Sequence, residues 1–460
     1  MIKWRYLILL ITLIIFIGIL LLPTPEGLSI PGQKALAIFS LCLILWVTNV
    51  IPLSITSLLA IVLLPLLNVL DAKTAYSLFG NNAVFFILGA FILAAALMSS
   101  GLSTRLALFF LTKFKKSPKR LLMGILLSSA FLAFWMPEHV VAALMFPIIL
   151  EIADSLKLEP DKSIYGKAIF LSLAWGAVIG GVATFLGGAR NPLAIGILYE
   201  DYKMKIGFLE WMIAIVPIVI VMLGFAYLII RFFFKIDIKD ISAAEEILTQ
   251  KINRLGTMSK EEKIVGIIML VTILCWITLS NYLGLAIIAI LSAISLFVFD
   301  VVHWKEIEEY VNWGVILMYG GAIALGSALA QTKAAEWLAL TLLSRFTLTS
   351  FSLVLLISFI AKFLTEGISN TAAVAILLPL GFALGQAHGV NPIIMVYVIA
   401  VPAGLAFCLP MGTPPNAICY SAGYYRISDA VKAGLVLNFI SWLIFVLMIL
   451  IYWPLIGLTF

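Results

Sequence analysis

Long apolar runs, separated by short polar breaks, follow one another from one end of the chain to the other. Runs of ~20 apolar residues are long enough to cross the hydrocarbon core of a bilayer as helices. These runs are continuous and do not alternate residue by residue, which excludes a transmembrane β-barrel. The pattern therefore predicts an all-α polytopic membrane protein, with nine uninterrupted spans at 6–22, 34–49, 52–70, 83–101, 208–234, 263–280, 282–302, 314–330 and 431–455.

One apolar stretch, Lys362–Gln386, is broken in its middle by the polar cluster Thr365–Thr371. Such a cluster is stable at membrane depth only against protein or a water-filled cavity. Each apolar flank, 351–365 and 372–386, has 15 residues, fewer than the ~20 that a full span needs. We therefore expect 351–386 to form a re-entrant helical hairpin.

The same design occurs earlier in the chain, in Phe131–Pro147, which aligns with Phe363–Pro379 at an offset of 232 residues. A second matched pair, Gly187–Asn191 and Gly412–Asn416, follows at an offset of 225 and breaks one more span in each half, 165–199 and 392–423. Two halves with one hairpin and one broken helix each are typical of secondary transporters with a midplane site. The prediction is thus eleven spans, two re-entrant hairpins and inverted five-helix repeats.

These features divide the chain into three parts. Residues 1–235 contain the first helix and the N-terminal repeat with hairpin 118–157, 236–262 form a cytoplasmic linker, and 263–460 form the C-terminal repeat with hairpin 351–386. An amphipathic piece, 103–116, and a second piece, 334–345, are expected on the membrane surface, with an extension of the preceding span as the alternative for 103–116. Lys and Arg are about three times more frequent on the side of the N-terminus, which predicts a cytoplasmic N-terminus and an extracytoplasmic C-terminus.

Composition agrees with this class. The chain has 460 residues, of which 63% are hydrophobic and 11% charged, and its net charge of +6 follows from basic cytoplasmic loops rather than from binding of nucleic acid. The four cysteines lie in apolar segments without CxxC spacing and are interpreted as buried small residues. No HExxH motif is present and only three histidines occur, so we expect a transporter in the cell membrane and not an enzyme.

Polar groups at the breaks are the candidate binding site. Hydroxyl and amide side chains and helix N-termini can hold the carboxylates of a small dicarboxylate anion. A channel could also use short hairpins, but an inverted pair of polar tips favours alternating access. The residues that we assign to the substrate are Glu138, His139, Arg190, Asn191, Ser369, Asn370, Thr371, Gly412, Thr413, Pro414 and Asn416.

Ser369-Asn370-Thr371 and the block Leu409–Ala417 resemble the divalent-anion/sodium symporter family of dicarboxylate, citrate and sulfate carriers, and the resemblance covers nearly the whole chain. It implies a homodimer in which a transport domain slides against a fixed scaffold, an elevator mechanism. It also implies that substrate and sodium lie between the hairpin tips and the broken helices. No other cofactor is expected, and a residual sodium site would use Thr365, Ser369 and Asn370.

The first half departs from the family pattern. Its tip reads Pro137-Glu138-His139 where Ser-Asn-Thr is usual, and Arg190 stands in its Gly-rich block. We interpret Arg190 as a fixed positive charge in place of sodium, with Glu138 as its partner and His139 as a donor to substrate; the pair could instead only pin the hairpin to the helix. A fixed charge favours sodium-independent exchange of C4–C5 dicarboxylates such as succinate or 2-oxoglutarate. The alternative is sodium- or proton-coupled symport of a dicarboxylate, citrate or sulfate, the proton variant through His139.

Glu366 is the remaining charge in the second hairpin. It could bind a cation or a proton, and the spacing favours a bond to Lys362 one helical turn earlier.

Overall fold

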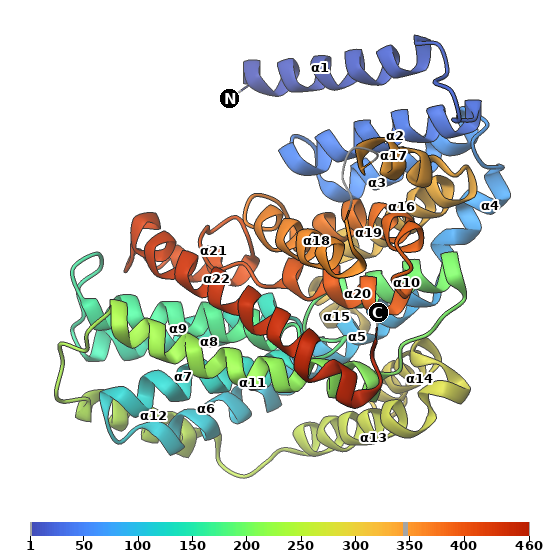
Figure 1. Cartoon of the computed structure of the whole chain (residues 1–460). Helices are drawn as coiled ribbons and strands as arrows, with labels where there is room; N and C mark the ends of the chain where they lie inside the picture. Colours follow the sequence, from blue (N-terminus) through green and yellow to red (C-terminus); the bar gives the residue numbers. More distant parts are fainter. Residues whose placement is uncertain (1, 344–347, 460) are drawn as a thin grey trace.

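The computed structural model describes residues 2–343 and 348–459, in which every regular element is a helix (Figure 1). The elements before the linker are α1 Ile2–Leu21, α2 Ile30–Thr48, α3 Leu53–Leu66, α4 Ala72–Ser77, η1 Leu78–Gly80, α5 Asn82–Ser99, α6 Leu102–Phe114, α7 Pro118–Ala133, α8 Glu138–Ser155, α9 Ile164–Gly180, α10 Arg190–Tyr202 and α11 Phe208–Phe233. The remainder are α12 Ser242–Leu255, α13 Lys260–Leu283, α14 Leu285–Val298, α15 Trp304–Tyr310, α16 Trp313–Gln331, α17 Ala334–Leu343, α18 Ser350–Leu364, α19 Asn370–Ala387, α20 Pro392–Ala400, η2 Pro402–Gly404, α21 Pro414–Tyr420, α22 Ile427–Ile451 and η3 Trp453–Ile456. The predicted all-α class is confirmed.

Eight helical stretches among the described residues are long and apolar enough to cross a membrane. They are 4–21, 30–48, 72–99, 208–233, 260–283, 313–331, 370–387 and 427–451. Five further apolar helices, among them α9, α18 and the α20–η2 stretch, are shorter. The multi-pass character is therefore shown, whereas the predicted number of eleven spans stays a prediction.

Each predicted hairpin is a pair of helices joined by a short turn. Ser117 caps α7 by accepting a hydrogen bond from the amide of Arg120 at 3.3 Å, and α7 ends at Ala133. Pro137 precedes α8, and a proline disfavours helical geometry in the residue before it, which separates the two arms. In the second hairpin Ser369 caps α19 by accepting from the amide of Ala372 at 3.2 Å. The helix pairs α7–α8 and α18–α19 thus coincide with the stretches 118–157 and 351–386, while their re-entrance into a membrane stays a prediction.

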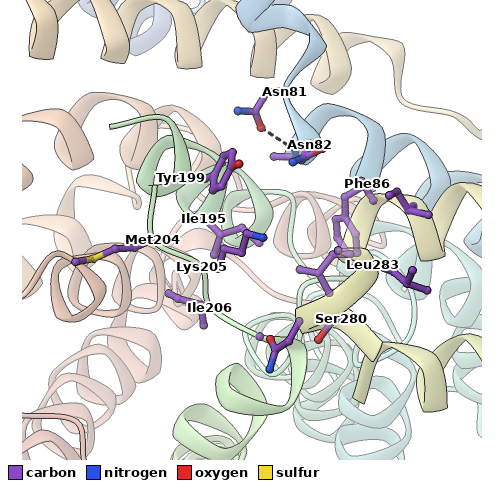
Figure 2. A pocket seen from close by; sticks show the side chains of 18 of the residues that line it. Asn81, Asn82, Phe86, Ile195, Tyr199, Met204, Lys205, Ile206, Ser280 and Leu283 are labelled. Carbon is purple, nitrogen blue, oxygen red and sulfur yellow. Dashed lines mark hydrogen bonds between the residues drawn. The ribbon is translucent and has the colours of Figure 1, made fainter. Parts of the chain in front are cut away.

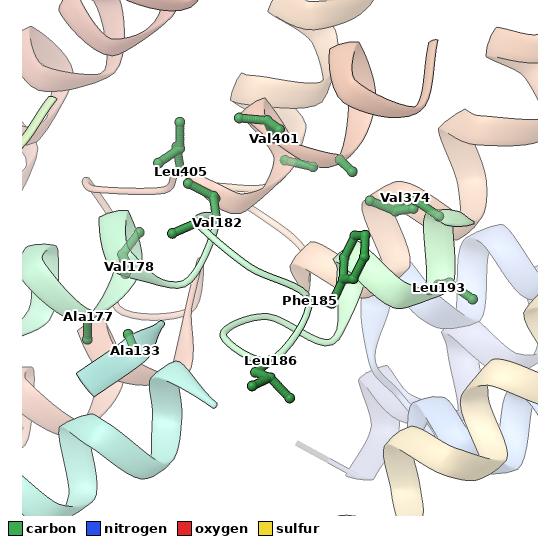
Figure 3. Packing of buried hydrophobic residues seen from close by; sticks show 14 of the residues in the cluster. Ala133, Ala177, Val178, Val182, Phe185, Leu186, Leu193, Val374, Val401 and Leu405 are labelled. Atoms are coloured by element: carbon green, nitrogen blue, oxygen red, sulfur yellow. The ribbon is translucent and has the colours of Figure 1, made fainter. Parts of the chain in front are cut away.

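The two broken helices are each followed by an irregular segment that returns to a second helix. Helix α9 ends at Gly180 and α10 starts at Arg190, while η2 ends at Gly404 and α21 starts at Pro414. Figure 3 shows three apolar side chains of the first irregular segment, Val182, Phe185 and Leu186; Val182 lies between Val178 of α9 and Leu405, and Phe185 lies beside Val374 and Leu193. All three are buried, so the irregular backbone is enclosed by protein as a non-helical segment at membrane depth requires.

An asparagine stabilises each irregular segment in the same way. The amide nitrogen of Asn191 donates to the carbonyl oxygens of Gly181 at 3.2 Å and Thr184 at 2.7 Å. That of Asn416 donates to the carbonyl oxygens of Ala406 at 2.9 Å and Leu409 at 3.4 Å. In both cases the acceptors lie 10 and 7 residues before the asparagine. Carbonyls that lost their helical partners are thereby paired.

The predicted linker forms helix α12, which packs on α6 and α8. Lys115 Nζ lies 3.3 Å from Glu245 Oε1, and Lys251 Nζ lies 2.7 Å from Glu151 Oε2 of the first hairpin. The amphipathic piece predicted at 103–116 is α6, and the linker covers part of it. The second amphipathic piece, 334–345, is helical as far as residue 343, and residues 344–345 lie outside the described part.

Candidate functional site

The two hairpin tips and the first broken helix meet at a buried ion pair. Glu138 is the first residue of α8 and Arg190 the first of α10, and Arg190 Nη1 lies 3.2 Å from both carboxylate oxygens. Their exposed fractions are 4% and 1%. The backbone amide of Glu138 also donates to the carbonyl oxygen of Gly187 at 2.8 Å, which fixes the tip to the irregular segment. The predicted pairing of Glu138 with Arg190 is thus observed.

Asn370, the first residue of α19, joins this pair from the second hairpin. With its oxygen turned toward Arg190, the amide oxygen accepts from Nη1 at 3.2 Å, and the amide nitrogen donates to the carbonyl oxygen of Gly412 at 2.9 Å and of Ala403 at 3.3 Å. In the opposite orientation the nitrogen lies 3.4 Å from Glu138 Oε1, but the amide oxygen then faces the oxygens of Ala403 and Gly412, which are acceptors like itself. We therefore assign the orientation in which the amide oxygen faces Arg190. Either way Asn370 connects the two halves.

Three oxygens converge on the amide nitrogen of Asn370 in this orientation. Thr365 Oγ1 lies 2.6 Å from the Asn370 amide and donates to the carbonyl oxygen of Ala403 at 2.8 Å, and the carbonyl oxygen of Gly412 completes the set. Hydroxyl, amide and carbonyl oxygens are the ligands of hard cations. A cation among these oxygens would favour the opposite orientation of the Asn370 amide. The amide oxygen would then face the cation instead of facing only other hydrogen-bond acceptors. The residues present therefore fit a sodium ion.

Arg190 keeps unused hydrogen-bonding capacity. Its Nε and Nη2 are buried and have no hydrogen-bond partner in the described residues. The guanidinium lies close to Gly188 and Gly404, where a Cβ atom on either glycine would overlap it. Side-on Nε and Nη2 donors are the pair with which arginine binds a carboxylate in a bidentate manner. Buried donors without partners are rare, which makes these two a candidate substrate contact.

The other predicted site residues divide into two groups. Asn191, Asn416 and Thr413 are buried and hold backbone, since Thr413 Oγ1 accepts from the amide of Asn416 at 3.4 Å. The hydroxyl of Ser369 caps its own helix. No hydrogen bond in the described residues joins the side chains of the remaining three to the ion pair: His139, Thr371 and Pro414.

Sequence reasoning missed the true partners of Glu366. The expected bond to Lys362 is wrong: the Glu366 carboxylate accepts from the backbone amides of residues 407–409 at 2.7–3.1 Å and from Asn438 Nδ2 at 2.6 Å. These partners are 41 to 72 residues away in the chain. Spacing on one helix could not reveal them.

A cavity of about 180 Å³ lies away from the tips, between α5, α10 and the turn that joins α13 to α14. Figure 2 shows Asn81, Tyr199 and Lys205 on one side of it and Ser280 and Leu283 on another. Asn81 is already committed, because it donates to Glu200 Oε1 at 2.8 Å and accepts from the amide of Ala83 at 2.7 Å. None of the residues that line the cavity belongs to the ion pair or to the hairpin tips. The cavity is therefore separate from the candidate site.

The pattern of two hairpin tips, two asparagine-braced breaks and a converging set of oxygens has a counterpart among known sequences. The family described as the sodium:sulfate symporter transmembrane region matches residues 3–459. The chain belongs to this family. Its members are membrane transporters and not enzymes, and this chain is a multi-pass membrane protein of that class.

Two relatives of the family are sodium-dependent dicarboxylate transporters named SdcS. The one from Staphylococcus saprophyticus is 31% identical over 462 residues, covering 95% of this chain and 89% of the relative. The one from Staphylococcus aureus strain USA300 is 31% identical over 469 residues, covering 96% and 90%. Identity at this level over almost the full length of both chains supports transport of a dicarboxylate.

Two solved structures share the fold at low identity. The Alcanivorax borkumensis YdaH transporter has a TM-score of 0.56 at 15% identity and covers 84% of this chain and 88% of its own. Neisseria gonorrhoeae MtrF has a TM-score of 0.57 at 12% identity, with 94% and 95% covered. Both are likenesses of fold alone.

Proposed function

We propose that this chain moves C4–C5 dicarboxylates across the cell membrane by sodium-coupled secondary transport, with the substrate held between the hairpin tips. The names of the relatives support both the dicarboxylate and the sodium dependence. The retained oxygen set around Asn370 supports a cation in the second half. The resemblance to the family extends the proposal to a homodimer that works by an elevator movement, with its N-terminus in the cytoplasm.

The proposal rests mainly on the charge balance of the hairpin tips. Four buried charged residues lie in the two hairpins and the adjoining helix: Glu138, Arg190, Lys362 and Glu366. Their formal charges cancel, so the protein offers no net positive charge to a substrate that carries about two negative charges. Burying an uncompensated charge at this depth costs about 3 kcal/mol or more. Cations taken from solution supply the missing charge.

Each residue has a distinct part in this mechanism. Thr365, Asn370 and the carbonyls of Ala403 and Gly412 would hold the sodium ion, which contributes positive charge next to the substrate. Arg190 donates from Nε and Nη2 to one carboxylate while Glu138 holds Nη1 on the other side. Thr413 and the start of α19 would receive the second carboxylate. Because substrate and ion occupy adjoining places, each strengthens binding of the other.

Exchange of dicarboxylates without sodium is the second candidate. The observation that favours it is Arg190 itself, a positive charge that cannot leave with the substrate. The sodium-dependent relatives do not support this expectation, and the ion pair with Glu138 leaves Arg190 without surplus charge. The structure gives no support to proton coupling through His139, because the ring of His139 has no hydrogen-bond partner in the described residues.

Transport by the purified protein in liposomes tests the proposal. Uptake of labelled succinate into empty vesicles should require an inward sodium gradient and should be inhibited by 2-oxoglutarate. Sodium-independent uptake that occurs only into vesicles preloaded with dicarboxylate would establish exchange instead. Equal uptake of sulfate or citrate with no competition by succinate would refute the C4–C5 assignment.

A further inference from the structure

A second pair of buried charges lies one helical turn before the tip of the second hairpin. Lys362 on α18 has an exposed fraction of 0%, its Nζ donates to the carbonyl oxygen of Leu405, and Nζ lies 4.4 Å from the centre of the Phe407 ring. The ammonium therefore has one carbonyl and one aromatic face as partners, the latter through a cation–π contact. Neither partner belongs to the substrate site described above.

Glu366 carries the opposite charge and binds the backbone amides of the same irregular segment. Oε1 accepts from the amides of Phe407 at 2.7 Å and Cys408 at 3.1 Å, and Oε2 accepts from those of Cys408 at 3.1 Å and Leu409 at 3.0 Å. Asn438 of α22 adds a hydrogen bond to Oε1 at 2.6 Å. A carboxylate that accepts several backbone amides is well stabilised in its ionised form. Lys362 thus holds the carbonyl of Leu405, and Glu366 holds the amides of residues 407–409.

This segment lies in the chain between Ala403 and Gly412, whose carbonyl oxygens belong to the oxygen set. Thr365, between the two charged residues, donates to the carbonyl oxygen of Ala403, and Asn416 holds the carbonyls of residues 406 and 409 from the other side. Glu366 Oε2 lies against Gly412, whose carbonyl oxygen faces Asn370. A movement of the segment by a few tenths of an ångström would therefore displace the carbonyls of Ala403 and Gly412.

The first half shows that the fold itself does not need such charges. At the offset of 232 residues, Lys362 and Glu366 correspond to Ala130 and Phe134. There Thr184 Oγ1 donates to the carbonyl oxygen of Phe134 at 2.6 Å, and Gly180 packs directly on Ala130. At these equivalent positions the first half braces its break without charged side chains, whereas the second half, which carries the oxygen set, uses two.

We propose that Lys362 and Glu366 are positioning residues that set the sodium affinity of the second-half oxygen set by fixing residues 405–409. The inference rests on the proposed function, because it concerns the cation that this function requires. The pair acts through the backbone and touches neither ion nor substrate. Its loss should therefore weaken sodium binding while substrate binding at saturating sodium is kept.

The test uses Lys362→Met and Glu366→Gln in the full-length protein, reconstituted in liposomes. We expect the sodium concentration for half-maximal succinate uptake, and the sodium concentration that half-maximally raises the melting temperature of the purified protein, to rise about tenfold or more in each. The succinate KM at saturating sodium should change less than about threefold. The double variant should be no worse than the poorer single variant, because both act on one segment. Lys167→Met is the matched control: it removes a lysine from an ion pair with Asp429 at 2.8 Å, outside the site, and should leave both constants unchanged.

Asn438→Ala provides a milder variant should the others fail to fold. It removes one hydrogen bond to Glu366 and should raise the sodium requirement by about threefold. Variants with reduced amounts of folded protein but an unchanged sodium requirement would show a purely structural role and overturn the inference. A wild type that ignores sodium would overturn the proposed coupling and this inference together, whereas a sodium-dependent wild type with unresponsive variants overturns the inference alone.

Discussion

Removal of Glu138 should destabilise the protein through Arg190. The carboxylate is the one ionised partner of the guanidinium in the described residues, and Arg190 Nε and Nη2 already lack partners. Breaking a buried pair from one side costs about 3–5 kcal/mol, because the other charge stays buried without compensation. Glu138→Ala should therefore be among the most destabilising single changes at the tips.

The expected shift of the melting temperature follows from chain length. An unfolding entropy of about 2.1 cal/mol/K per residue gives roughly 1 kcal/mol per °C for 460 residues, so the predicted loss is about 3–5 °C. Differential scanning fluorimetry of the purified protein in detergent, at one fixed scan rate, measures it. Asp161→Asn is the control: it breaks the exposed contact to Arg426 Nε at 2.8 Å and should leave the melting temperature unchanged.

The double variant Glu138→Leu with Arg190→Met separates stability from transport. Replacing both charges by apolar side chains should restore the melting temperature to within about 1 °C of the wild type, since a buried pair adds little net stability. Transport should nevertheless stay absent, because the donors to the substrate carboxylate are gone. A double variant that transports succinate normally would refute the substrate role and leave Glu138 and Arg190 as a pin between hairpin and helix.

Three further changes probe the same site. Gly404→Ala should abolish transport, because the added Cβ would overlap the guanidinium, whereas Gly224→Ala, with open space around its position, should transport normally in the same liposome assay. Thr365→Val should raise the sodium concentration for half-maximal uptake by about tenfold, since it removes one oxygen of the set; an unchanged requirement would exclude the hydroxyl as a ligand. Asn416→Ala should cost about 1–3 kcal/mol, measured as a lower melting temperature, because two buried carbonyls lose their donor.

Sequence patterns were sufficient for the all-helical class and for the two pairs of helices that form the hairpins. The polar residues that break the apolar runs placed the two turns, because α8 starts at Glu138 and α19 at Asn370. The offset between the two halves predicted that Glu138 and Asn370 are equivalent, and the structure brings these two residues next to each other. The ion pair of Glu138 with Arg190 followed from the cost of isolated charge at depth.

Other features depend on contacts that no spacing along the chain encodes. Glu366 has backbone partners in the 407–409 segment, and the side chain of Asn438 comes from the last long helix. The sequence favoured Lys362 because residues four apart on a helix face each other, but irregular backbone nearby offers more hydrogen bonds than one ammonium. The carbonyl of Ala403 was likewise invisible, since every residue has a carbonyl and only the broken helix aims this one at Thr365.

The central claim is that substrate and ion bind where the two tips meet, and a cryo-electron microscopy map of the protein with succinate and sodium tests it most directly. The account predicts density for one carboxylate within hydrogen-bonding distance of Arg190 Nε and Nη2, and ion density among Thr365, Asn370 and Gly412. Succinate density in the cavity beside Lys205, with the tips unchanged, would contradict it.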